Sequence, residues 1–212
     1  MTPRLFTRFQ NSARQRVRIV LHLKGIDYAY VPVLDAADPA YHALNPQGLM
    51  PALEIGGRVV AQSSAIVELL EDLWPVPSVL PADPFLRAEV RAFAQHITAD
   101  LHPVNNNRVR RYLRDPLGVG EAEILGWYRH WVAVTFASLE AQLARHGRDS
   151  TYCFGDRPGL AEACLVPQMD NARRFGCDLG AYPRLLAVDA ACRGLDAFRR
   201  AAPEAQPDYP GG

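Results

Sequence analysis

The stretch RFQNSARQRVRIVLHLKG, residues 8–25, decides the first part of the fold, because a strand-like segment, a polar break and a helix follow one another within it. The polar break is QNSAR, residues 10–14. After it, apolar residues recur at helical spacing from Val17 to Leu21, and Gly25 lies where a helix usually ends. The pattern therefore predicts a helix that begins within or just after the polar break.

The segments on either side of this helix have the character of strands. Residues 4–9 alternate and contain mostly β-forming residues, and residues 26–33 are richer still in them. In a β-α-β unit, the turn before the helix is a natural ligand site, because unpaired helix N–H groups and the helix dipole point into it. An ordinary surface turn with a Ser or Asn cap has the same pattern, so both interpretations stay open at this point.

The chain then continues with a loop, a hairpin and a second helix. Residues 34–51 contain turn-forming Asp, Pro and Gly residues. Two short apolar runs flank Gly56–Gly57, which is a strong hairpin signal. A helical pattern follows as far as Leu73, with Ser63 or Ser64 as the expected N-cap.

A proline-rich linker separates this part from the rest of the chain. Its prolines are Pro75, Pro77, Pro81 and Pro84. Beyond it, helical periodicity replaces strand alternation in residues 85–102, 121–146, 160–176 and 182–201. We therefore expect an α/β domain at residues 1–79, the end of the linker at 80–84, and an all-helical domain at 85–212. The last ten residues, 203–212, are so rich in Pro and Gly that we expect them not to be ordered.

Composition excludes several classes of function. The 212 residues contain 23 Lys and Arg against 23 Asp and Glu, so the charge does not point to a nucleic-acid or membrane-surface partner. The four cysteines, Cys153, Cys164, Cys177 and Cys192, lack the spacing of metal ligands. No apolar run has the length of a signal peptide or a membrane span. We therefore expect a cytoplasmic protein without a metal, in a reducing compartment.

The order of these elements resembles the architecture of glutathione transferases, and six motifs sharpen the resemblance to their zeta class. In the first half they are RVRIVLHLKGIDY (16–28), ALNPQGLMPALE (43–54) and QSSAIVELLED (62–72). In the second half they are DLHPVNNNRV (100–109), CLVPQMDNARRFGCDL (164–179) and PEAQPD (203–208), which are more similar to bacterial maleylpyruvate isomerases than to animal maleylacetoacetate isomerases. Several motifs in the right order are far more specific than a single short pattern.

The resemblance implies a thioredoxin-like first domain, an all-α second domain and glutathione as cofactor. The implied activity is the cis–trans isomerisation of an unsaturated oxo acid or diacid such as maleylpyruvate or maleylacetoacetate, by addition of the glutathione thiolate, bond rotation and elimination. It also implies a homodimer, in which the first domain of one subunit contacts the helical domain of the other.

Site residues can be carried over from the resemblance position by position. Met50, before a cis Pro51, would bind the cysteinyl part of glutathione through its backbone, and Gln62 and Ser63 would bind the γ-glutamyl carboxylate. The second-half residues expected to bind glutathione are His102, Asn106 and Asn107. Asparagines so dense within a helix are poor helix formers, which favours a polar role that faces the cleft. Arg174 and Arg108 would bind a substrate carboxylate.

The polar break is where the match is weakest. Gln10 replaces an arginine that contacts substrate in the family, Asn11 replaces a serine, and Ala13 replaces a Cys or Thr. We expect Ser12 to be the main side-chain donor to the thiolate, Asn11 to be secondary, and Arg14 to assist through its charge. Three explanations follow: a true isomerase with relocated contacts, an isomerase-like enzyme for a different substrate with fewer carboxylates, and a glutathione transferase fold whose thiol step has been lost. The alternative functions are a glutathione-conjugating or thiol-independent enzyme of specialised metabolism and a non-catalytic ligand-binding homologue.

Overall fold

The computed structural model describes residues 2–146 and 150–210, and its contacts divide the chain into two compact units. The first unit comprises Met1–Leu80 together with Arg193–Gly212, and the second comprises Pro81–Cys192. Within the described residues, no helix is both long enough and apolar enough to cross a membrane.

The first unit is built on a four-stranded sheet. Its strands are β1 (Arg4–Thr7), β2 (Ala29–Pro32), β3 (Ala52–Ile55) and β4 (Arg58–Ala61), in the order β2-β1-β3-β4. β1 pairs with β2 in parallel and with β3 antiparallel, and β3 forms the predicted hairpin with β4. Gly56 and Gly57, which make the hairpin turn, both have positive φ, a conformation that glycine adopts without steric cost.

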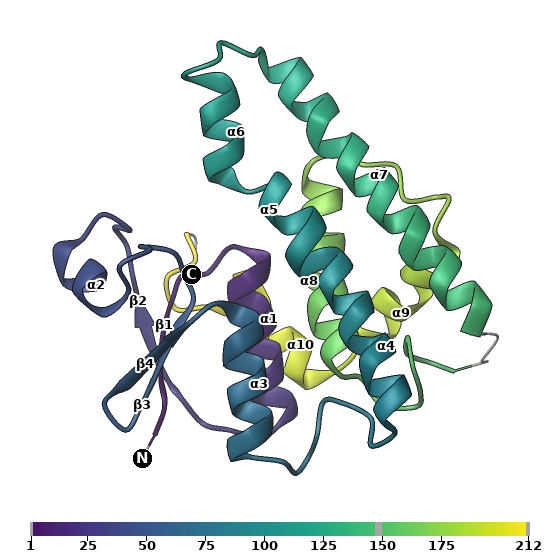
Figure 1. Cartoon of the computed structure of the whole chain (residues 1–212), viewed down its shortest axis with the longest axis horizontal. Helices are drawn as coiled ribbons and strands as arrows, with labels where there is room; N and C mark the ends of the chain where they lie inside the picture. Colours follow the sequence, from purple (N-terminus) through teal and green to yellow (C-terminus); the bar gives the residue numbers. More distant parts are fainter. Residues whose placement is uncertain (1, 147–149, 211–212) are drawn as a thin grey trace. The chain divides into compact units, whose positions relative to one another are not determined.

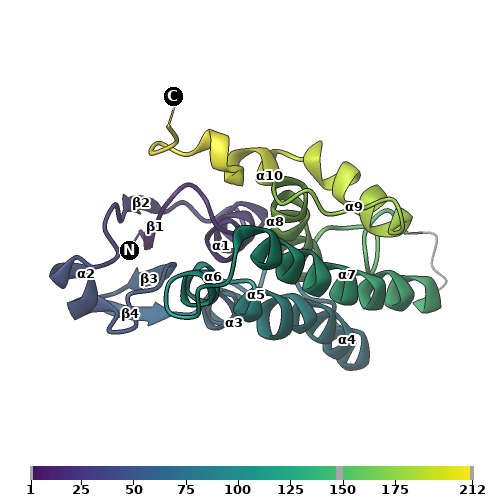
Figure 2. The same ribbon diagram turned by 90° about the horizontal axis from the view of Figure 1, so that it is seen from above.

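Helices cover both faces of this sheet (Figures 1 and 2). α1 (Ser12–Leu23) packs against α3 (Ser63–Leu73) on one face, and both helices have fully buried apolar side chains, among them Val17, Val20, Ile66 and Leu70. On the other face, Phe6 of β1 packs with Tyr41 of the short helix α2 (Pro39–Leu44). Because successive side chains of a strand point to opposite faces, β1 contributes to the core on each side of the sheet. The predicted β-α-β opening is confirmed.

The end of the chain differs from the sequence-based expectation. The helical pattern of residues 182–201 is two helices, α9 (Pro183–Arg193) and α10 (Asp196–Ala201), and α10 packs on α1 in the first unit. Beyond α10, a 3₁₀ turn, η2 (Pro203–Ala205), leads to Gln206, which is buried. The expectation of a disordered tail is therefore wrong for the described residues up to 210, because polar contacts can order a Pro-rich segment that has no periodicity. The domain bounds expected from the sequence stay a prediction.

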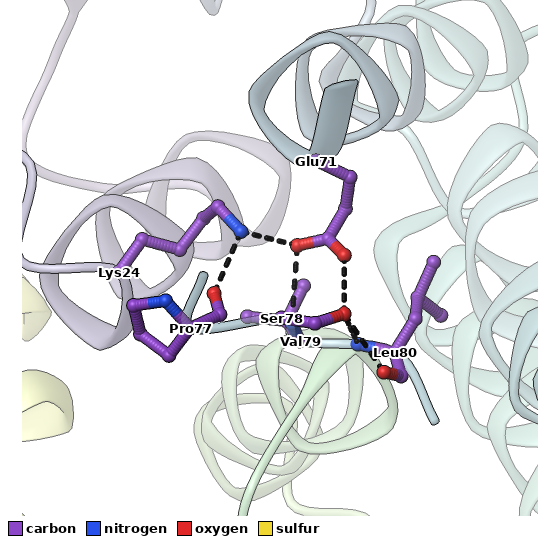
Figure 3. A network of polar contacts seen from close by, with 6 residues as sticks. All are labelled: Lys24, Glu71, Pro77, Ser78, Val79 and Leu80. Carbon is purple, nitrogen blue, oxygen red and sulfur yellow. Dashed lines mark hydrogen bonds and ion pairs between the residues drawn. The ribbon is translucent and has the colours of Figure 1, made fainter. Parts of the chain in front are cut away.

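A buried ion pair fastens the proline-rich segment to α1 and α3 (Figure 3). The ammonium of Lys24, whose side chain is fully buried, donates to Glu71 Oε1 and to the Pro77 carbonyl oxygen at 2.8 Å. The Glu71 carboxylate also accepts the Ser78 hydroxyl at 2.5 Å and the Val79 N–H at 3.0 Å. One pair of charges therefore connects two helices with the chain that leaves the first unit.

The second unit is helical, as predicted. Its elements are α4 (Pro84–Gln95), the π-helical turn η1 (His96–Leu101), α5 (His102–Val104), α6 (Asn107–Arg114), α7 (Glu121–His146), α8 (Leu160–Arg174) and most of α9. α8 is its central helix, because residues on all of its sides are buried. The Glu162 carboxylate caps the start of α8 and accepts the N–H groups of Cys153 and Gly159.

The asparagine-rich segment of this unit corrects a second expectation. Asn105 and Asn106 do not lie within a helix; they form the break between α5 and α6. Asn106 is the N-cap of α6, and its Oδ1 accepts the Arg108 N–H at 3.1 Å. Asn105 is buried and donates to the Tyr128 carbonyl oxygen at 3.1 Å. Capping and packing therefore explain asparagines that the sequence attributed to a cleft-facing role.

Candidate functional site

Three segments expected to bind glutathione lie at one edge of the sheet in the first unit. The register pairs Phe6 with Ala52 and Ala52 with Ala61, so these residues form a row across β1, β3 and β4. The polar break follows β1, Met50–Pro51 precedes β3, and Gln62–Ser63 follows β4. Because β3 runs antiparallel to β1 and β4, all three segments leave the sheet at the same edge.

The polar break is organised by an asparagine cap. Asn11 is the N-cap of α1: its Oδ1 accepts the Ala13 N–H at 2.9 Å, and its carbonyl oxygen accepts the Gln15 N–H at 3.0 Å. Its φ of 139° lies in a region that residues other than glycine rarely adopt. Ser12, the first residue of α1, is only 1% exposed. Of the two caps that the sequence left open, Ser or Asn, the structure has Asn11, and the amide NH₂ of Asn11 is the remaining donor of its side chain.

A half-buried cation, Arg14, adjoins this turn. Arg14 Nη1 donates to the Gln10 carbonyl oxygen at 2.7 Å, and within residues 2–146 and 150–210 the buried Nε atom of Arg14 has no hydrogen-bond partner. Burial, followed by the charges of Arg18 and Arg8, lowers the pKa of Arg14 to about 10. Because this pKa is still far above 7, the guanidinium keeps its charge at neutral pH, whereas the side chain of Gln10 is exposed and uncharged.

The loop before β3 is held by two side chains. The hydroxyl of Tyr41 and Nδ2 of Asn45 both donate to the Leu49 carbonyl oxygen, at 2.7 and 2.6 Å. The next peptide bond, Met50–Pro51, is cis, so this prediction is confirmed. The backbone of Met50 therefore lies in a braced segment at the sheet edge.

The start of α3 adds a positive site that the sequence did not reveal. Ser63, expected as a possible N-cap, is the first residue of the helix, and its hydroxyl accepts Arg16 Nη1 at 2.6 Å. Arg16 is 1% exposed, and its buried Nε and Nη2 have no hydrogen-bond partner among the residues that the structure describes. Gln62, with φ of 69°, instead donates through Nε2 to Gln47 Oε1 at 2.7 Å. A guanidinium next to a helix N-terminus, with two of its nitrogens unpartnered in the described part of the chain, fits a carboxylate ligand, so these residues fit glutathione.

Four of the predicted residues lie around the break between α5 and α6 in the second unit. Nδ2 of Asn106 lies 3.4 Å from Nε2 of His102. Asn107 is exposed, and its Oδ1 accepts Arg110 Nη2. Arg108 is also exposed. The structure therefore brings His102 and Asn106 together but assigns Asn106 a capping role.

Arg174 has a cationic neighbour that the sequence did not indicate. Its guanidinium lies 4.8 Å from the centre of the Phe175 ring, and the guanidinium of Arg110 lies 4.6 Å from the same ring. Burial lowers the pKa of Arg174, the hydroxyl of Tyr128 raises it, and the charge of Arg110 lowers it. Two arginines on one aromatic ring form a dicationic cluster, Arg110–Arg174, suited to an acidic ligand.

Other chemistry has little support in the residues that the structure describes. Among residues 2–146 and 150–210, no group of three or more His, Cys, Asp or Glu side chains could hold a metal ion. The four cysteines are free thiols, and burial raises the pKa of Cys153 and Cys177. High thiol pKa values disfavour these two cysteines as nucleophiles.

Comparison with known sequences gives matches along nearly the whole chain. Residues 14–73 match the family model of the glutathione S-transferase N-terminal domain. The chain is 47% identical over 209 residues to the maleylpyruvate isomerase of a Ralstonia species, covering 97% of this chain and 99% of that protein. It is 42% identical over 214 residues to the maleylacetoacetate isomerase of Pseudomonas aeruginosa, covering 98% of this chain and 99% of that protein.

Solved structures agree with the sequence matches. The holo structure of a maleylpyruvate isomerase, described as a bacterial glutathione S-transferase of the zeta class, matches with a TM-score of 0.95 and 47% identity, over 98% of this chain and 100% of that chain. A maleylacetoacetate isomerase from Anaeromyxobacter dehalogenans, solved with glutathione in its active site, matches with a TM-score of 0.87 and 40% identity, over 99% of this chain and 98% of that chain. The chain therefore belongs to the zeta class of glutathione transferases, the family of the maleylpyruvate and maleylacetoacetate isomerases.

Proposed function

We propose that this chain is a glutathione-dependent cis–trans isomerase of an unsaturated oxo acid or diacid, such as maleylpyruvate or maleylacetoacetate. The observation that carries the proposal is the sheet edge of the first unit, where three segments of the zeta-class pattern leave the sheet together and the buried Arg16 donates to Ser63. The named activities of relatives at 42 and 47% identity support the reaction class.

The start of α3 is the proposed site for the γ-glutamyl carboxylate of glutathione. The N–H groups of the first helical turn, the Ser63 hydroxyl and the charge of Arg16 all favour an anion there. Gln62 is the proposed polar neighbour of this carboxylate, and the backbone of Met50 is the proposed partner of the cysteinyl residue. His102, Asn106 and Asn107, in the second unit, stay predicted glutathione contacts.

When bound, glutathione supplies a thiolate that adds to the cis double bond and leaves after rotation. The task of the polar break is to favour that charged form, because the free thiol, with a pKa of about 8.5, is mostly protonated at neutral pH. The N–H groups at the start of α1 contribute whatever the side chains. Ser12 and Asn11 are the proposed directed donors, and the charge of the half-buried Arg14 acts through space.

The Arg110–Arg174 cluster is the proposed grip for a substrate carboxylate. It fixes the acid and stabilises the negative charge that develops next to the double bond. Arg108 and Gln10 stay predicted substrate contacts, although Gln10 has no charge and therefore forms weaker bonds with a carboxylate than an arginine would.

We expect wild-type protein to isomerise maleylpyruvate or maleylacetoacetate only when glutathione is present, and to lower the pKa of the bound thiol from about 8.5 to below about 7.5. The isomerisation is followed by the absorbance of the cis acid. The pKa of the bound thiol is measured by titrating the ultraviolet absorbance of the thiolate. Isomerisation without glutathione would indicate a thiol-independent enzyme, and no glutathione binding at millimolar concentration would indicate a non-catalytic homologue.

Variants of the polar break extend this experiment. Ser12→Ala and Asn11→Ala should each raise the pKa of the bound thiol, with the larger rise for Ser12→Ala. Asn11→Ala also removes the N-cap, at a cost of about 1 kcal/mol of stability. Asn11→Asp is the matched control, since it keeps a cap oxygen but removes the amide donor. If none of the three raises the pKa, the helix N–H groups alone stabilise the thiolate.

The proposed oligomeric state is a homodimer. Several large apolar side chains are exposed in the single chain, among them Leu73 at 50%, Val76 at 84% and Phe85 at 82%. Burial of such side chains against a second copy is favourable. We expect light scattering to give twice the chain mass across the micromolar range, and a monomer mass there would contradict the proposal.

The proposed compartment is the cytoplasm. All four cysteines are free thiols, and free thiols persist in reducing compartments. Fractionation of the host cells, with the protein recovered outside the cytosolic fraction, would overturn this assignment.

A further inference from the structure

The last described residues, 203–210, form a strap across the first unit, and we call them the C-terminal strap. Figure 1 shows this segment, in yellow, beside β1 and the start of α1, and Figure 2 shows it above the loop that joins them. Asp208 Oδ2 accepts the backbone N–H of Phe9 at 3.1 Å, and Oδ1 accepts the Tyr30 hydroxyl at 2.5 Å. The ring of Tyr209 meets the ring of Phe9 edge-on, with centroids 5.5 Å apart.

The C-terminal strap is itself anchored to the fold. Gln206 is buried, and its Nε2 donates to the carbonyl oxygens of Arg200 and Ala202 at 2.8 and 2.7 Å. The Tyr209 N–H donates back to the Gln206 carbonyl oxygen at 3.1 Å, which closes a turn. Asp208 is therefore presented to Phe9 from a fixed support.

A buried arginine holds the other side of the same loop residue. Arg18, which is fully buried, donates to the Phe9 carbonyl oxygen at 2.8 Å and to the Arg8 carbonyl oxygen at 3.1 Å. It also donates twice to the Ala201 carbonyl oxygen at the end of α10. Both backbone polar groups of Phe9 are thus fixed by contacts that depend on the end of the chain.

The reason for so firm a hold lies two residues further on. Asn11 adopts a φ of 139°, and a strained conformation of this kind persists only where its surroundings over-determine it. On the helix side, the cap contacts to Ala13 and Gln15 fix Asn11. On the strand side, the Gln10 carbonyl oxygen accepts Arg14 Nη1, and one residue earlier Asp208 and Arg18 hold both backbone polar groups of Phe9.

We propose that Asp208 is a positioning residue for the thiol site: through the Phe9 N–H it fixes the loop that sets the backbone of Asn11 and the donors of the polar break. This inference rests on the proposed function, because it assumes that the polar break receives the glutathione thiol. It also assigns a role to the PEAQPD motif, whose last residue is Asp208.

Asp208→Asn tests the proposal, because an amide keeps the shape of the side chain but has one acceptor oxygen for two donors. We expect faster hydrogen exchange at the Phe9 N–H, a higher pKa of the bound thiol, and kcat/KM lower by about tenfold. The dissociation constant of glutathione should change less than twofold, since the proposed γ-glutamyl site at α3 is untouched. Glu204→Gln removes the same charge from an exposed place on the strap and should change none of these quantities.

Tyr30→Phe is the second variant, and it serves if Asp208→Asn does not fold. It removes only the hydroxyl that orients Asp208. Exchange at the Phe9 N–H, the thiol pKa and kcat/KM should therefore change in the same directions, but by less. If Phe9 exchanges faster but the thiol pKa and kcat/KM stay at wild-type values, the strap is structural only and the proposal is overturned. If wild-type protein does not lower the thiol pKa, the proposed function fails instead, and Phe9 exchange still reports whether Asp208 holds the loop.

Discussion

Replacing Lys24 with methionine is expected to lower the free energy of unfolding by about 3 to 5 kcal/mol, the usual cost when one partner of a buried ion pair is removed. Lys24 is fully buried, and Glu71, whose side chain is 12% exposed, would keep its charge without a cation nearby. The hydrogen bond to the Pro77 carbonyl oxygen is lost as well. Urea denaturation at pH 7 measures the effect.

The pH dependence of this loss has a definite sign. Burial alone would raise the pKa of Glu71, but the hydrogen bonds from Lys24, Ser78 and the Val79 N–H outweigh it, and the pKa is lowered. A lowered carboxyl pKa contributes stability above the unfolded pKa of about 4.3, and this contribution is lost as the pH falls through the folded value. The difference between wild type and Lys24→Met should therefore be largest near pH 7 and should shrink below about pH 4.

A double variant separates the cost of an orphaned charge from the net value of the pair. Lys24→Met with Glu71→Leu replaces both charges by apolar groups, and it should recover most of the stability lost in Lys24→Met. Loss of less than about 1 kcal/mol in the single variant would mean that water replaces the ammonium at Glu71, as at exposed ion pairs. The ion pair would then not be what fastens the proline-rich segment.

Local pattern predicted the first unit well because its elements are short and consecutive. The alternation of residues 4–9 and the helical spacing after the polar break are local signals, and β1 and α1 follow them. The same signals overran a break in the helical half, because Gly194 lies between α9 and α10 within the predicted run 182–201. Asn105 and Asn106, which were expected within a helix, form the break between α5 and α6. A helix end set by a cap or by a tertiary contact has no period of its own.

The site was predictable to the extent that its segments match a known pattern. The cis bond at Pro51 came from that resemblance, whereas the place of the polar break before α1 came from helical spacing, and both are present. Arg16 and Arg110 were missed because a single arginine on a helix has the same appearance whether it is solvated or buried. Asp208 was missed because its partners, Phe9 and Tyr30, lie almost the whole chain away.

Removing both arginines of the Arg110–Arg174 cluster is expected to lower kcat/KM for an acidic substrate by about a hundredfold or more. A charge-assisted, bidentate contact between an arginine and a carboxylate contributes about 1.5 to 3 kcal/mol. Arg174→Ala alone should therefore lower kcat/KM by about tenfold or more. The two guanidinium groups lie on one ring, at 4.6 and 4.8 Å, so their effects should not simply add. Steady-state kinetics of the single and double variants give the coupling between the two residues.

One lysine substitution and one alanine substitution at an arginine outside the cluster make this test specific. Arg174→Lys keeps the charge but not the planar fork, so it should restore only part of the activity lost in Arg174→Ala. Arg184→Ala removes a charge from an exposed ion pair with Glu140 in the same unit and should leave kcat/KM unchanged. A double variant as active as wild type, with its fold intact, would exclude the cluster from substrate binding. The carboxylate would then have to be held by the remaining cation of the prediction, Arg108, which Arg108→Ala would reveal.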